Sequence, residues 1–115
     1  LESEYQQVIL NIISNAKDAL IGKGVENATI EVTFLDECVC IKDNAGGVPQ
    51  DIVERIFEPY YTTKEQGKGT GLGLYVSREI IGSMGGEISY STSNLGGAEF
   101  TIELPIQIEL DEEME

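Results

Sequence analysis

The segment from Phe57 to Leu74, FEPYYTTKEQGKGTGLGL, constrains this chain more than any other part of it. An aromatic and threonine cluster leads through a stretch without apolar periodicity into four alternating glycines, namely Gly67, Gly69, Gly71 and Gly73. Apolar residues then recur at helical spacing, which places the glycines at a helix N-terminus: Leu72, Val76, Ile80 and Met84. Glycine lets the backbone approach a ligand closely, and unpaired amides with the helix dipole favour an anion there. The segment therefore predicts the lid and phosphate end of a nucleotide site.

Two common glycine loops do not fit these letters. A Walker loop needs Ser or Thr after its Gly-Lys pair, and neither Gly22-Lys23 nor Gly67-Lys68 is followed by one. A dinucleotide fingerprint needs a third glycine and a preceding strand, and both are missing here. A glycine run alone is more often a flexible turn, so the nucleotide interpretation depends on the other motifs.

Composition bounds the class of protein. A chain of 115 residues with 41% hydrophobic content is one small folded, soluble domain. No apolar run approaches the roughly 20 residues of a membrane span, and the start, LESEYQQ, is not a signal peptide. Because the chain lacks an initiator Met and begins almost directly on a predicted helix, we interpret it as a fragment of a longer protein.

The net charge of −14, from 21 acidic and 7 basic residues, makes nucleic acid or an anionic membrane a poor partner. An anionic ligand would need backbone amides, lysines and a metal ion, so magnesium is expected. Cys38 and Cys40 share one face of a predicted strand and cannot bridge each other without strain. Since the chain has no histidine for a soft metal site, we expect buried reduced thiols.

The first predicted helix has an apolar face that runs as far as Gly22. At about 100° per residue, Asn11, Asn15 and Asp18 fall within a sector of roughly 60° at the border of this face. Two asparagines one turn apart beside a carboxylate suit a site for a hard cation. The alternative is that Asn11 and Asn15 are half-buried amides bonded to neighbouring backbone.

The alternating segment 29–42 predicts a β-hairpin that runs into DNAGGVP, residues 43–49. Asp43, at a strand end before two glycines, is placed to accept a hydrogen bond from a donor such as an adenine amino group. An Asx-turn carboxylate is equally common at a strand end, so both interpretations stay open.

The second half of the chain repeats this order of elements. A short amphipathic helix after Pro49 precedes the unpatterned stretch 58–70, whose length is typical of a lid and whose only positive charges are Lys64 and Lys68. The glycine-led helix runs to about Met84, and two alternating strands follow, joined through residues 94–97. The acidic run after Pro105 predicts a solvated tail.

This ordered set of motifs resembles the ATP-binding catalytic domain of sensor histidine kinases, within the wider GHKL family. NIISNAKDAL is similar to the N box, DNAGGVP to the first glycine box, IFEPYYTTK to the F box, and GKGTGLGL to the second glycine box. The glycine pair before AEFTIELP resembles the closing turn. Each motif alone is weak, whereas the ordered set is specific and covers nearly the whole chain.

The resemblance implies a role for each matching position. Asn15 would be the magnesium ligand, Asp43 the adenine-recognising carboxylate, and Gly47 the glycine that approaches the base closely. Lys64 would neutralise the γ-phosphoryl group, and the second glycine box would bind the phosphates through Gly69, Thr70, Gly71, Leu72, Gly73 and Leu74. Asp18 stands at a nucleotide-contacting position where many such kinases carry a basic residue. Asn11 is assigned to the catalytic set; ATP-hydrolysing relatives place a glutamate base there, and since an amide cannot take a proton from water, transfer is favoured over hydrolysis.

The implied fold is a two-layer α/β sandwich over residues 1–105, with a mixed sheet packed on helices and an ATP lid between the second and third helices, followed by an acidic tail at 106–115. The implied activity is that of a protein-histidine kinase with ATP and Mg²⁺ as cofactors. The acceptor histidine would lie on a separate dimerisation and phosphoacceptor domain of a homodimeric parent, with a response regulator as an indirect partner. The domain itself would be cytoplasmic, without nucleic-acid or membrane contact, even if the parent is membrane-anchored.

Two alternatives remain at this point. Turnover of ATP by the isolated domain would favour a GHKL ATPase or a serine kinase of a regulatory protein. Nucleotide binding without transfer to any acceptor would favour a non-catalytic binding module.

Overall fold

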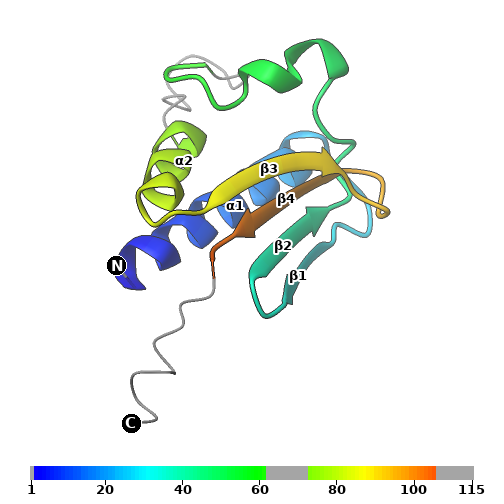
Figure 1. Ribbon diagram of the computed structural model, residues 1–115. Helices are drawn as coiled ribbons and strands as arrows, with labels where there is room; N and C mark the ends of the chain where they lie inside the picture. Colours follow the sequence, from blue (N-terminus) through cyan, green and yellow to red (C-terminus); the bar gives the residue numbers. More distant parts are fainter. Residues whose placement is uncertain (1, 62–72, 106–115) are drawn as a thin grey trace, which may run out of the picture.

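The computed structural model describes residues 2–61 and 73–105. It forms two layers, with a four-stranded sheet on one side and two helices on the other (Figure 1). The elements are α1 (Glu2–Gly22), β1 (Ile30–Phe34), β2 (Cys38–Asp43), the 3₁₀ helix η1 (Gln50–Arg55), α2 (Gly73–Ser83), β3 (Glu87–Thr92) and β4 (Ala98–Glu103). The predicted two-layer sandwich and its order of elements are confirmed.

Helix α1 packs on the sheet because its apolar residues repeat every fourth position. The buried side of the helix is formed by Val8, Ile12, Ala16 and Leu20. These residues meet the inward side chains of the central strands, Val39 and Ile41 on β2 and Phe100 and Ile102 on β4. The core therefore lies between α1, α2 and the middle of the sheet.

The strand order is β1-β2-β4-β3, and every described pair is antiparallel. The sequence led us to expect a mixed sheet, which is corrected for the described strands. The physical reason is that each half of the chain folds back on itself as a hairpin. The two hairpins then join through β2 and β4, which also run in opposite directions, so no parallel pair arises.

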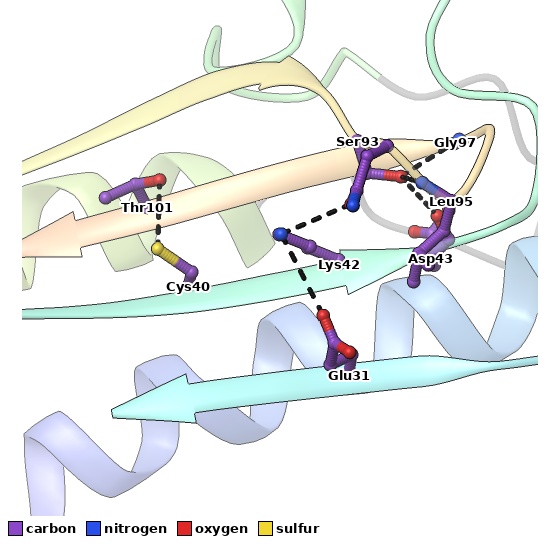
Figure 2. Close-up of polar contacts among 9 residues, drawn as sticks. Glu31, Cys40, Lys42, Asp43, Ser93, Leu95, Gly97 and Thr101 are labelled. Carbon is purple, nitrogen blue, oxygen red and sulfur yellow. Dashed lines mark hydrogen bonds and ion pairs between the residues drawn. The ribbon is translucent and has the colours of Figure 1, made fainter. Parts of the chain in front are cut away.

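The two cysteines lie on the outer face of the sheet rather than in the core. Val39 and Ile41 point inward, so the alternation of the strand turns Cys38 and Cys40 away from the helices, where both are half-buried free thiols. Cys40 Sγ lies 3.8 Å from Thr101 Oγ1 on β4 (Figure 2). Burial is the main effect that raises the pKa of the Cys38 thiol, and the Cys40 thiol raises it further. The expected reduced thiols are present, but they are half-buried on the outer face of the sheet and do not lie in the core.

Helix α2 ends in a tight reversal into β3. Gly85 adopts φ +84°, and the Gly86 amide donates to the Ile81 carbonyl at 2.9 Å, as at other glycine-capped helix ends. A Cβ at Gly86 would overlap the Glu103 carbonyl oxygen and lie 2.7 Å from Leu104 Cδ2. The end of α2 is therefore packed against the last residues of β4.

Candidate functional site

Asp43, the last residue of β2, is a carboxylate buried at the end of the sheet, with 5% of its surface exposed. Its Oδ1 accepts hydrogen bonds from the Ala45 amide at 2.9 Å and from the Ala98 amide at 3.1 Å. Both bonds end on the same oxygen, so Oδ2 can accept a hydrogen bond from a ligand.

The turn between β3 and β4 contacts the backbone of Asp43. The Ser93 hydroxyl donates to the Asp43 carbonyl oxygen at 2.8 Å and accepts from the amides of Leu95 and Gly97, both at 3.1 Å (Figure 2). A Cβ at Gly97 would overlap both the carbonyl oxygen and Oδ1 of Asp43. Glycine is therefore required here, because the two backbones are closer than any side chain permits.

The loop after Asp43 contains two glycines with left-handed backbone. Gly46 has φ +91° and donates its amide to the Gly96 carbonyl at 2.9 Å, while Gly47 has φ +76°. A Cβ at Gly47 would lie 3.0 Å from the Tyr90 hydroxyl oxygen, so a side chain there would crowd β3. Lys23, just after α1, donates to the Ala45 carbonyl at 2.6 Å and ties the end of that helix to this loop.

Tyr90→Phe is expected to lower the free energy of unfolding by about 1 kcal/mol, because the Val48 amide donates to the Tyr90 hydroxyl at 2.8 Å and would lose its acceptor. For a domain of this size the melting temperature should fall by roughly 4–8 °C. Thermal denaturation, monitored by circular dichroism, measures this change in melting temperature. Tyr75→Phe on α2 is the matched control, since the Tyr75 hydroxyl has no hydrogen bond to another described residue. An unchanged melting temperature in Tyr90→Phe would contradict the structure at this loop.

The three polar residues predicted on the helix edge lie on α1 as expected, but they differ in surroundings. Asn11 donates through Nδ2 to the Ser77 hydroxyl of α2 at 3.2 Å. Asn15, one turn further, is half-buried, and Asp18 is exposed. Both Asn15 and Asp18 also have interaction partners.

The glycine box is described only at its end. Helix α2 begins at Gly73, followed by Leu74, and both are half-buried. The other predicted residues of the lid and glycine box lie outside the described residues, namely Lys64, Gly69, Thr70, Gly71 and Leu72. The predicted helix is thus confirmed from Gly73 onward, whereas its start at the preceding glycines and the phosphate contacts stay predictions.

The described candidates gather at one end of the sandwich. Lys23 joins the end of α1 to the Asp43 loop, and α2 has its C-terminal end at the opposite end of β4 from Ala98. The N-terminus of α2 is therefore directed toward the end of the sheet that carries Asp43, as is the C-terminal half of α1. A carboxylate, an amide-bearing helix edge and the described start of a helix thus lie toward the same end of the sandwich.

Positive side chains in the described ranges are largely engaged elsewhere. Lys42 contacts Glu31 at 3.8 Å and donates to Asn94 Oδ1 at 3.2 Å (Figure 2), and Arg55 lies 3.3 Å from Glu58. The Arg78 guanidinium stacks over the Phe57 ring at 4.9 Å. As far as the described residues go, an anion at this end would therefore depend mainly on backbone amides and a bound cation.

Some residues that build the site were not found from the sequence. Ser93 precedes a glycine turn, where serine often bonds the local backbone, so its role had a weak local signal. Ser77 and Lys23 had none, because their partners are brought to them only by the packing of separate elements.

A family model described as histidine kinase-, DNA gyrase B-, and HSP90-like ATPase matches residues 1–108. This chain belongs to that ATPase family. The family implies that the domain binds ATP, which agrees with the buried Asp43 and the glycine cradle around it. The match extends three residues beyond the domain end that we predict at residue 105.

Curated relatives of this ATPase domain are sensor kinases. The two-component sensor PprA of Pseudomonas aeruginosa is 41% identical over 114 residues, which cover 90% of this chain and 12% of PprA. Sporulation kinase C of Bacillus subtilis is 34% identical over 106 residues, covering 92% of this chain and 24% of the relative. The domain thus spans less than a quarter of these proteins, which are much longer than this chain.

Solved structures agree with the fold. The catalytic domain of histidine kinase ThkA is 32% identical with a TM-score of 0.70, over 90% of this chain and 66% of that one. The ATP-binding domain of PrrB from Mycobacterium tuberculosis, at 23% identity and a TM-score of 0.60 over 89% of this chain and 68% of that one, supports the fold alone. Within the described ranges, neither helix is both long and apolar enough to cross a membrane.

Proposed function

We propose that this ATPase domain binds ATP with Mg²⁺ and donates the γ-phosphoryl group to a histidine on a separate dimerisation and phosphoacceptor domain of a two-component sensor kinase. The observation that carries the proposal is Asp43, a buried carboxylate with one oxygen held by two amides and the other able to accept from a base. The adenine amino group is a donor of the required kind. The kinase relatives support transfer of the phosphoryl group to an acceptor rather than hydrolysis of ATP.

The residues around Asp43 fit a flat base. At Gly47 and Gly97 a Cβ would crowd Tyr90 or overlap Asp43, so glycine at both positions lets the loops close tightly around the end of β2. Gly47 is half-buried and carries no side chain that could cover a base at the end of β2. Asp43 would select adenine, and Gly47 would allow its close approach.

The residues at the helix end fit a phosphate chain with a magnesium ion. Asn15 presents a half-buried amide, whose oxygen is a suitable ligand for a hard cation, on the helix that packs beside the N-terminus of α2. Held there, a magnesium ion would supply the positive charge that neutralises the phosphates. Asp18 lies on the same edge of α1. Gly73 and Leu74 lie at the start of α2, where backbone amides would bind the phosphates. We propose phosphate contacts also for Lys64, Gly69, Thr70, Gly71 and Leu72.

In this arrangement the domain contributes position and charge rather than a covalent intermediate. The acceptor histidine is not in this chain, which has no histidine. We propose that the parent is a homodimer which passes the phosphoryl group on to a response regulator, and that this domain works in the cytoplasm.

The test is calorimetric titration with a non-hydrolysable ATP analogue, with and without magnesium, followed by incubation with γ-labelled ATP and a histidine phosphoacceptor domain. Magnesium-dependent binding and acid-labile label on the acceptor are the expected results. Release of inorganic phosphate without labelling of the acceptor would instead indicate an ATP-hydrolysing domain.

Asn15→Ala is expected to reduce the affinity for the magnesium-bound analogue to the value measured without magnesium, because the variant removes the amide oxygen that would hold the ion. Binding without magnesium should change little. Titrations in both conditions measure this ratio. Ser14→Ala, an exposed position on the same helix, is the control. If Asn15→Ala keeps the full magnesium effect, the assignment of Asn15 is wrong.

A further inference from the structure

The contact between the two helices contains a partly buried polar pair, Asn11 on α1 and Ser77 on α2. The Asn11 amide donates to the Ser77 hydroxyl at 3.2 Å, and Ser77 is 0% exposed, so it cannot touch a bound nucleotide. The buried residues next to them on the same helices are apolar, with Ile12 on α1 and Ile81 on α2. Apolar contacts tolerate small shifts of one helix along another, whereas a hydrogen bond between two specific atoms is satisfied in a single register.

The helices run in opposite directions. The residues that follow α2 pack against Glu103 and Leu104, and Leu104 lines a cavity together with Tyr5 near the start of α1. The C-terminal end of α2 is thus level with the N-terminal half of α1 (Figure 1).

This direction places two site residues on one level. Asn15 is four residues beyond Asn11 on α1, and Gly73 is four residues before Ser77 on α2. Four residues advance a helix by about 6 Å, slightly more than one turn. From the Asn11–Ser77 bond, one turn along each helix in the same spatial direction therefore leads to Asn15 on one side and to the start of α2 on the other.

We propose that Asn11 is a positioning residue, whose hydrogen bond to Ser77 fixes the register of α1 against α2 and so holds Asn15 level with the N-terminus of α2. The inference rests on the proposed function, since it concerns how the magnesium ligand meets the phosphates. It gives Asn11 a role through Ser77 in place of the direct catalytic role suggested by the sequence. It also explains why a serine occupies a fully buried position near the buried apolar residues Ile12 and Ile81.

The test compares Ser77→Val with Ser77→Thr. The two side chains have the same shape and differ by the hydroxyl, so both carry the same cost of an added methyl group in the core. We expect the magnesium-bound analogue to bind about 3- to 10-fold more weakly to Ser77→Val than to Ser77→Thr, the range for loss of one hydrogen bond. Binding without magnesium should be similar in the two variants. Equal affinities in the presence of magnesium would overturn the inference.

A second readout needs no nucleotide. In amide NMR spectra of the free chain, Ser77→Val should displace the resonances of the Gly73 backbone and the Asn15 side chain, while Ser77→Thr should leave them near the wild-type positions. Equal displacement in both variants would contradict the fixed register. Ser83→Ala is the control, because the Ser83 hydroxyl bonds the Ile80 carbonyl within α2 and does not reach α1.

The two proposals fail in different ways. If the wild-type chain shows no magnesium-dependent binding, the proposed function is wrong, and the NMR comparison alone decides the register. If the wild type binds as expected and Asn11→Ala combined with Ser77→Val gives simply additive losses, the residues do not act through each other, and the positioning role is rejected.

Discussion

Asp43→Asn is expected to weaken ATP binding by roughly 10- to 150-fold while the domain stays folded, which corresponds to about 1.5–3 kcal/mol for a hydrogen bond to a charged group. The carboxylate offers an acceptor on both sides: Oδ1 serves the amides of Ala45 and Ala98, and Oδ2 is left for the adenine amino group. An amide side chain has one oxygen and one NH₂ group. In either orientation of the introduced amide side chain, its NH₂ group faces a donor, which is either the pair of backbone amides or the adenine amino group.

Calorimetric titration with ATP and with GTP measures this effect. Guanine presents a carbonyl where adenine has its amino group, so the preference for ATP over GTP should shrink in Asp43→Asn. Asp36→Asn, in the exposed turn between β1 and β2, removes the same charge far from the site and serves as the control. An Asp43→Asn chain that binds ATP like the wild type would refute the assignment of Asp43.

Gly97→Ala is expected to destabilise the domain by about 1–3 kcal/mol and to reduce ATP binding further than the loss of stability explains. The added Cβ would overlap the Asp43 carbonyl and carboxylate oxygens, neither of which is the end of a flexible side chain free to move away. β4 must then shift, and its Ala98 amide would no longer reach Oδ1.

Thermal denaturation and titration with ATP on the same sample separate the two parts of this prediction. Gly22→Ala is the matched control, because a Cβ at the end of α1 meets no atom within 4 Å and should be nearly neutral. A Gly97→Ala chain with wild-type stability and affinity would show that the strands are farther apart than the structure indicates.

Local pattern was sufficient to predict most elements of this fold. The helix predicted from the four-residue apolar repeat, the two hairpins predicted from their alternation, and the helix that follows the glycines, from Gly73 onward, are confirmed at nearly the predicted residues. Asp43 could be nominated because it stands at a strand end before two glycines. The signal was the same as that of an ordinary Asx-turn, and the bond to the Ala45 amide, two residues on, shows that this local contact is also made.

What the sequence could not show is which distant residues complete the site. Ser93 and Ala98 contact Asp43 across 50 and 55 residues of chain, so no periodicity or spacing links them. The antiparallel pairing of β2 with β4 likewise depends on tertiary packing, and the expectation of a mixed sheet failed for that reason. The position of Cys38 and Cys40 on the outer face, where both are half-buried, depended on which face of the sheet the helices cover.

The contacts of Asp43 with the β3–β4 hairpin also bear on the order in which the domain assembles. The β1–β2 hairpin closes a short stretch of chain, whereas β4 must return over some 60 residues to pair with β2. Contacts that close long loops form late, because more chain entropy is lost before they are made. A partly folded chain with only the first hairpin has Asp43 but neither the Ala98 amide nor the Ser93 hydroxyl that hold it. Nucleotide would therefore recognise only the completed sheet and stabilise it selectively, including in a chain newly released from the ribosome.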